Sequence, residues 1–170
     1  GLYPLSLHGA LPSSNVGGLL IQSAMGVGDG NAIEVSVGSI EVQNLTQGAI
    51  HLLESDDVDI ENLAQVGSGE ILFDSTVGTI TVRGGGTGVA GNENVRLGAL
   101  LQDVVINAEV VSVSGNITLD AGNDLTVSSS VSTGGSGTVY MVAVNELTVT
   151  ESVITVSGDI LVEAGDRQSV

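Results

Sequence analysis

The chain of 170 residues contains no cysteine, no tryptophan and no lysine, and it has only two prolines, one phenylalanine and two tyrosines. The absence of cysteine excludes disulfide bonds and thiolate metal sites. Because aromatic residues are so few, the core must be built from Val, Ile and Leu. Together with 25 glycines and many Ser and Thr residues, this composition favours strands and tight turns over helices.

Positive charge is also scarce. Arg83, Arg96 and Arg167 are the only basic residues besides two histidines, against 20 acidic residues, and the formal net charge is −17. Repulsion between like charges argues against nucleic acid and anionic membranes as partners. We interpret the acidity as a solvated surface that keeps an exported protein soluble, rather than as a dedicated cation-binding surface. Divalent cations would still screen such a surface.

Long apolar segments are missing as well. The longest apolar run lies around residues 17–21, far short of the ~20 residues that a membrane-spanning helix needs. No basic segment precedes it, so no signal peptide is visible. We expect no membrane span in this segment, and we expect any export signal to lie outside it.

The first fifteen residues differ from the rest of the chain. They hold both prolines and lack the alternation of apolar and polar residues that follows. Residues 2–12 resemble a peptide translated from sequencing-adapter DNA at the edge of an assembled read, with Gly9 in place of the usual aspartate. We predict a non-native or disordered arm at residues 1–15, which removes His8 from consideration, and one repeat domain at residues 16–170.

A short apolar motif recurs along the repeat domain. Its first and third residues are apolar in every copy, and they share one face of a strand because the side chains of a strand alternate. The first members, at steps of 21 to 24 residues, are Ile50, Ile71, Val95, Ile117, Val139 and Ile160. The residues that follow them face outward and are mixed in kind: His51, Leu72, Arg96, Thr118, Tyr140 and Leu161. Strand-like repeats of this length predict a β-solenoid.

Two further sets of apolar residues complete the repeat. The second column consists of Ile40, Ile60, Ile80, Val104, Leu125, Leu147 and Gln168. Asn62 interrupts its companion positions, and we attribute this to a bulge that brings Leu63 inward. A third apolar segment occurs in the later turns, at residues 110–113, 131–133 and 153–156. We therefore predict an all-β fold, a right-handed parallel β-helix of about six turns with three strands per turn.

Glycine and asparagine mark the expected corners. The glycine-rich residues 84–88 lengthen one turn and predict a loop on one side of the solenoid. Asn123, Asn145 and Asp166 recur at one corner, where we predict a ladder of amide hydrogen bonds between turns. Neither end shows a capping element, so we expect an uncapped fragment of a longer protein.

Residues 115–127, which read Gly-Asn-Ile-Thr-Leu-Asp-Ala-Gly-Asn-Asp-Leu-Thr-Val, resemble the repeats of large bacterial surface proteins of the filamentous-haemagglutinin-like kind. The resemblance covers roughly residues 35–170. It implies a right-handed β-helix that is secreted or held at the cell surface and that acts as a structural and adhesive stalk. The partners it implies are a host or neighbouring-cell surface, glycans included, and the remainder of the parent chain.

The densest acidic cluster comprises Glu54, Asp56, Asp57, Asp59 and Glu61. Paired carboxylates on a β-helix can bind or cleave carbohydrate, which gives an alternative function for this segment. No Lys or Arg partner and no aromatic platform is apparent on the same face, so we favour an exposed acidic corner and expect no catalytic residues and no enzymatic activity.

A calcium-stabilised module is a second alternative. Residues 26–31, with Asp29 among glycines, partly resemble a calcium-binding nonapeptide, although the motif occurs once. The candidate Ca²⁺ ligands are Asp29, Asp56, Asp57 and Asp59. His51 has no other ligand type beside it in the sequence, so we interpret it as a solvated side chain. No other cofactor is expected.

Overall fold

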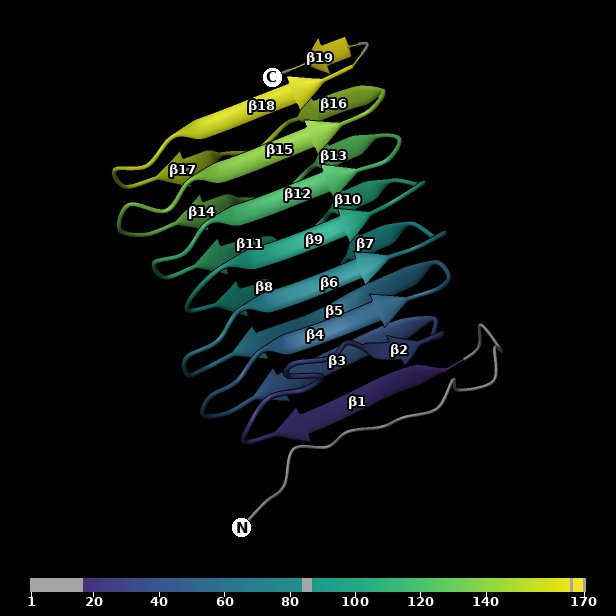
Figure 1. Cartoon of the computed structure of the whole chain (residues 1–170). Helices are drawn as coiled ribbons and strands as arrows, with labels where there is room; N and C mark the ends of the chain where they lie inside the picture. The colour runs from purple at the N-terminus through teal and green to yellow at the C-terminus, as the bar shows by residue number, and fades with distance from the viewer. Residues whose placement is uncertain (1–16, 84–86, 166, 170) are drawn as a thin grey trace.

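The described part of the chain is built from strands. The structure, a computed structural model, describes residues 17–83, 87–165 and 167–169, and in these residues it contains nineteen strands and no helix. Accordingly, no helix in this part of the chain could cross a membrane. The strands of successive turns pair in parallel and stack along one axis as a β-solenoid (Figure 1). The arm predicted at residues 1–15 lies outside the described residues.

One side of the solenoid is a seven-stranded parallel sheet to which each turn contributes one strand (Figure 1). Its strands are β2 (Ile33–Val35), β4 (Ile50–Glu54), β6 (Ile71–Ser75), β9 (Val95–Ala99), β12 (Ile117–Ala121), β15 (Val139–Ala143) and β18 (Ile160–Ala164). The solenoid therefore has seven turns in the described part, one more than the sequence predicts.

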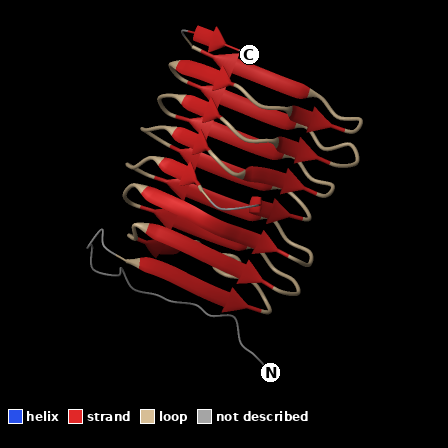
Figure 2. Ribbon diagram, turned by 180° about the vertical axis from the view of Figure 1, so that it is seen from behind, coloured by secondary structure: helices blue, strands red, loops and turns tan. Residues whose placement is uncertain are grey.

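The remaining strands form the second sheet, which faces the viewer in Figure 2. Its long strands are β1 (Gly18–Ser23), β3 (Ser39–Asn44) and β5 (Val58–Gln65). Later turns replace the long strand by two short ones. The first set is β7 (Ile80–Val82), β10 (Val104–Ile106), β13 (Leu125–Val127), β16 (Glu146–Val149) and β19 (Arg167–Ser169); the second is β8 (Thr87–Gly91), β11 (Glu109–Ser112), β14 (Val131–Thr133) and β17 (Val153–Thr155).

Strand β5 marks the change from two strands per turn to three. Its first half pairs with β7 and its second half with β8. The predicted three strands per turn are thus confirmed from β6 upward, whereas β3 and β5 each cover two sides of their turns with one strand.

The first predicted column is confirmed throughout. Its residues pair in register from turn to turn. Four of them, Ile50, Ile71, Ile117 and Val139, have no exposed surface, so each is covered by the turns above and below. Ile160 is 45% exposed because no described strand of this sheet lies above β18. Such columns of stacked aliphatic side chains form the core of the solenoid.

The sequence repeat did not predict the first turn, because the strand of that turn is interrupted. Val27 forms a bridge with Ile50, and the chain then leaves the sheet before Ile33 pairs with Leu52. A step of one repeat back from Ile50 falls on Asp29, inside this excursion. The sequence therefore has no apolar residue at this position, although this turn does contribute a strand, β2, to the sheet.

The second predicted column is wrong at one step. Val58 pairs with Ile80 and Ile60 pairs with Val82, so the column shifts by two residues from the predicted match of Ile60 with Ile80. The predicted bulge is confirmed: the register skips Glu61. Leu63 then pairs with Val42 and is fully buried.

The predicted loop at residues 84–88 is wrong in part. Residues 84–86 lie outside the described residues, but Thr87 and Gly88 belong to β8. Gly88 is the extra residue of a register shift, since Thr87 pairs with Glu109 and Val89 with Val110. A side chain at Gly88 would overlap Val82 in the core, which explains the glycine.

A buried polar column lies at the corner that leads into the seven-stranded sheet. Asn44 Nδ2 donates hydrogen bonds to the backbone carbonyls of Gln47 (3.0 Å) and Gly48 (2.7 Å) and to Oε1 of Gln65 (2.9 Å). Three turns after Asn44, the Ser112 hydroxyl accepts a hydrogen bond from the Gly115 N–H (2.9 Å). These side chains satisfy backbone groups of the tight turns that the strand ladder leaves unpaired. In the described residues no buried side-chain nitrogen or oxygen lacks a hydrogen-bond partner.

The asparagines of the predicted amide ladder donate to carboxylates and not to one another. Asn123 Nδ2 donates to Oδ1 of Asp103 (2.7 Å), and Asn145 Nδ2 donates to Oδ1 of Asp124 (2.8 Å). Each amide therefore bonds a carboxylate of the preceding turn instead of another amide. Asp166 lies outside the described residues.

Leu119→Asp tests whether the turns are coupled. Leu119 is fully buried in β12, so an unpaired carboxylate there should cost at least about 4 kcal/mol of unfolding free energy. Hydrogen exchange should accelerate together in β9, β12 and β15, because each turn depends on its neighbours. The matched control is Thr118→Asp, which places the same charge on the outer face. Faster exchange confined to β12 would contradict the coupling.

Candidate functional site

The predicted acidic cluster is divided by the fold. Glu54 is fully buried at the end of β4, whereas Asp57 and Glu61 are exposed. Asp59 Oδ1 lies 2.9 Å from Nε of Arg83. The expectation that no arginine accompanies the cluster is therefore wrong, because Arg83 comes from the following turn.

Aspartates at the corners, one of them in this cluster, cap the backbone of the next turn. Asp57 Oδ1 accepts a hydrogen bond from the Thr79 N–H (2.7 Å). Asp103 accepts the N–H of Asp124 (3.1 Å), and Asp124 accepts the N–H of Glu146 (3.0 Å). A carboxylate before a strand thus satisfies a donor that the parallel ladder leaves free. Part of the acidity is therefore structural.

The calcium candidates do not come together. Asp29 is exposed in the excursion between β1 and β2, where the Asn31 N–H donates to the Gly28 carbonyl (3.1 Å). Gly28 and Gly30 have φ values of 71° and 81°, the left-handed conformation that glycine adopts without strain. Among the described residues, no three Asp, Glu or His side chains are grouped so that they could hold a metal ion.

Glu54 is a buried carboxylate rather than part of an exposed corner. In the turns above it the same inward position holds Ser75 and then Ala99. Its carboxylate accepts hydrogen bonds from the backbone N–H groups of Val37 (3.2 Å), Ser55 (2.9 Å) and Asp56 (3.2 Å). Burial raises the pKa of Glu54 to about 7; the three N–H donors oppose this rise, and the nearby charge of Asp56 adds to it.

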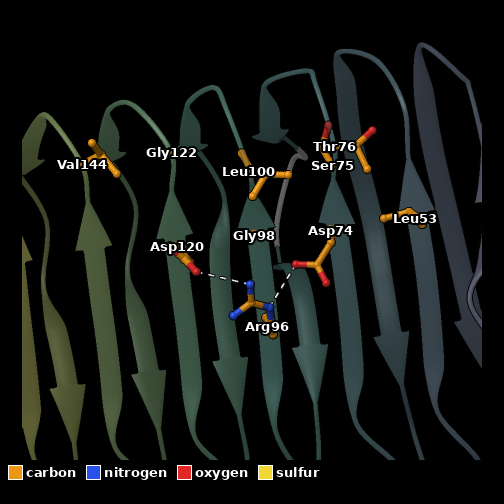
Figure 3. A pocket seen from close by; sticks show the side chains of 11 residues that line it. Leu53, Asp74, Ser75, Thr76, Arg96, Gly98, Leu100, Asp120, Gly122 and Val144 are labelled. Carbon is orange, nitrogen blue, oxygen red and sulfur yellow. Dashed lines mark hydrogen bonds and ion pairs between the residues drawn. The ribbon is translucent and has the colours of Figure 1, made fainter.

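A recess lies on the outer face of the seven-stranded sheet (Figure 3). It has a volume of about 430 Å³ and spans several turns. Its lining combines two aspartates, one arginine and exposed aliphatic side chains: Leu53, Asp74, Ser75, Thr76, Arg96, Gly98, Ala99, Leu100, Asp120, Gly122 and Val144. We take this recess as the candidate site.

Arg96 bridges two aspartates at the centre of the recess. Its Nε lies 3.0 Å from Oδ1 of Asp74, one turn below, and its Nη2 lies 3.3 Å from Oδ2 of Asp120, one turn above (Figure 3). Partial burial lowers the pKa of the Arg96 guanidinium, but the charges and hydrogen bonds of the two aspartates outweigh burial and raise it. The three side chains together carry one net negative charge.

A glycine makes room for the bridge at the centre of the recess. Gly98 pairs with Asp74 and Asp120 in the same outward column, and a side chain there would overlap Asp74 and come within 2.9 Å of Arg96 Nη2. The missing side chain is therefore what lets the guanidinium lie between the aspartates. Gly122 is needed for a different reason, since a side chain there would overlap the backbone carbonyl of Leu100. Leu100 and Val144, which line the same recess, are 69% and 66% exposed.

The recess offers hydrogen-bond acceptors beside apolar walls. Asp74 Oδ2 and Asp120 Oδ1 accept no hydrogen bond from the described residues. They are therefore available to hydroxyl or ammonium groups of a ligand, with Leu100 and Val144 as apolar surface. The sequence pattern did place Arg96 on the outer face. The pattern did not predict the aspartates, because they lie two residues further along their strands, at an outward position that the apolar motif does not include.

Other outward residues accompany this recess. His51 lies on the outer face of β4, as predicted from the alternation. Tyr140 is 42% exposed on the outer face of β15, so this side of the solenoid does carry one aromatic ring.

Glu54→Gln tests the buried carboxylate. The folded-state pKa of Glu54 lies above its ordinary value of 4.5, so its contribution to stability is fully present below about pH 4.5 and is lost as the pH rises through about 7. Between pH 4.5 and 8 the wild type should lose on the order of 3 kcal/mol more unfolding free energy than Glu54→Gln. The control is the exposed Glu61→Gln, measured by urea titration. Equal losses in wild type and Glu54→Gln would contradict the assignment.

Gly98→Val tests the Asp74–Arg96–Asp120 bridge. The added side chain should displace the guanidinium and move the Arg96 Nε–H signal, one of only three in the chain, to the position of a free arginine in ¹⁵N NMR spectra. Stability should fall by about 1 kcal/mol or less, because the bridge is partly exposed. Thr118→Val, also on the outer face, should leave the signal in place. An unchanged Arg96 signal in Gly98→Val would rule out the bridge.

Comparison with protein-family models, with curated proteins and with solved structures found no match. The family resemblance of residues 115–127 therefore stays a prediction.

Proposed function

We propose that the chain is a structural and adhesive segment of a large exported surface protein, a stiff stalk whose turns face a partner. The observation that supports this role is the in-register parallel stacking of seven turns. The seven strands of the first sheet extend about 29 Å along the axis, at about 4.8 Å per strand.

Stiffness follows from how the turns are held. Backbone hydrogen bonds join each turn to the next, and the inward aliphatic columns are closed to solvent. Bending would have to open these bonds along one side while it exposes apolar surface to water. A stalk of this construction holds its outward side chains at fixed spacing and presents little flexible backbone to proteases.

Carbohydrate binding is a second candidate function, and the outer-face recess favours it. The free oxygens of Asp74 and Asp120 can accept hydrogen bonds from sugar hydroxyls, with apolar surface beside them. This recess suits the role better than residues 54–61, where Glu54 is buried and, among the described residues that line the hollow at Asp57 and Asp59, no apolar side chain is exposed. Turnover of pectin or alginate that is lost in Asp57→Ala would instead support a carbohydrate-cleaving enzyme.

Adhesion of coated beads tests the proposed role. Latex beads that carry the folded chain should stay attached to a cell layer under flow several-fold better than beads that carry Leu119→Asp, because adhesion requires the ordered outer surface. Free folded chain should compete with the beads. Beads that carry Thr126→Asp, which places the charge on the outer face of β13 in the other sheet, serve as the matched control and should adhere like wild type. Equal retention of wild-type and Leu119→Asp beads would contradict an adhesive role of the folded segment.

A further inference from the structure

An outward column on the seven-stranded sheet carries an acidic residue at every second turn. Its members pair in register from β2 to β18. In order they are Glu34, Leu53, Asp74, Gly98, Asp120, Val142 and Glu163. Acidic residues thus alternate with Leu, Gly and Val along the solenoid. We call these seven residues the acidic column.

The spacing of the charges is fixed by the strand ladder. Neighbouring strands lie about 4.8 Å apart, so successive acidic residues are about 9.6 Å apart along the axis. The whole column from Glu34 to Glu163 covers about 29 Å. Because every pair in the column is hydrogen-bonded strand to strand, this spacing does not depend on flexible loops.

Arg96 shows how this face accommodates a cation. Its guanidinium lies beside Gly98, between the acidic residues of the turns above and below. The outer acidic residues of the column, Glu34 and Glu163, are exposed. The column with Arg96 therefore carries a net charge of about −3.

We propose that the acidic column is a docking surface for an extended cationic polypeptide in the polyproline II conformation, with Lys or Arg at every third residue. A polyproline II helix has three residues per turn and rises about 3.1 Å per residue, so its cationic side chains recur on one face every ~9.3 Å. This repeat matches the acidic residues at ~9.6 Å. In a β-strand, side chains on one face recur at ~6.6 Å, which does not match.

The apolar positions and the overall charge fit the same partner. Leu53 and Val142 stand between the acidic residues, and the half-exposed Tyr140 lies on the same outer face of β15 as Val142. Proline rings of a polyproline II segment pack against apolar and aromatic side chains of this kind. The net charge of −17 would steer a cationic segment toward the surface. The cationic segment would be a partner of the proposed adhesive stalk, and in this respect the proposal rests on the proposed function.

Two peptides of the same composition test the spacing. One is a fluorescent (Lys-Pro-Pro)₄ peptide, whose first and last lysines lie about 28 Å apart. The other places the four lysines in one block before the eight prolines. Fluorescence anisotropy with the full chain at low salt should give an affinity for the periodic peptide about fivefold or more above that for the block peptide, because only its charges meet all four acidic residues.

Charge-matched variants test the location. Glu34→Gln with Glu163→Gln keeps the Arg96 bridge and should weaken binding of the periodic peptide about fivefold. Glu61→Gln with Glu151→Gln removes two exposed charges elsewhere and should change the affinity less than about twofold. Circular dichroism confirms that both variants fold.

Three results would overturn the proposal: equal affinity for both peptides, an equal loss in both double variants, or binding of a glucosamine oligomer while the periodic peptide does not bind. The test is independent of bead adhesion. Failed peptide binding with intact bead adhesion refutes the docking surface alone, whereas peptide binding without adhesion refutes the stalk role alone.

Discussion

The parallel hydrogen-bonded register between successive turns is the constraint on which the rest of this structure depends. Each strand receives its backbone partners from the turns below and above, so side chains one repeat apart must stack on one another. A column can then hold only residues that suit its surroundings. The inward columns near the middle of the strands are aliphatic, as at Ile71, Val95 and Ile117, because these residues are covered by the turns on both sides. Outward columns are free to vary, and the binding surface that we propose lies on them.

At the corners of the solenoid, the parallel register does not provide a partner for every backbone group. Tight turns leave N–H and C=O groups without ladder partners, and short polar side chains supply them: Asn44 and Ser112 on the buried side, Asp103 and Asp124 on the solvent side. The acidic composition is therefore partly a result of how parallel turns are closed. On the strand faces, Asp74 and Asp120 each keep one oxygen that accepts no hydrogen bond from the described residues.

The fold was readable from the sequence where the repeat was undisturbed. The column from Ile50 to Ile160 was predicted residue by residue, because its spacing changes only by insertions between strands. The prediction failed at Ile60, because Val58, two residues earlier on the long strand β5, is the residue that pairs with Ile80, and at Ile33, where an excursion splits the first strand. The candidate site was harder to foresee. The bridge from Arg96 to Asp74 and Asp120 joins three turns, and it forms because Gly98 has no side chain. The acidic sequence of residues 54–61 does not indicate that Glu54 is buried while Asp57 is exposed.

Disulfide trapping measures the register most directly, since the chain has no cysteine of its own. In the structure Asp59 pairs with Thr81, and neighbouring strands about 4.8 Å apart place these Cα atoms within the range of a disulfide bond. A chain with Asp59→Cys and Thr81→Cys should therefore oxidise rapidly to an intramolecular disulfide. A chain with Glu61→Cys and Thr81→Cys, which the uninterrupted sequence repeat would align, should not, because two residues along the strand add about 6.6 Å. Rapid oxidation of the second pair, with the first pair left reduced, would contradict the stacking described for this solenoid.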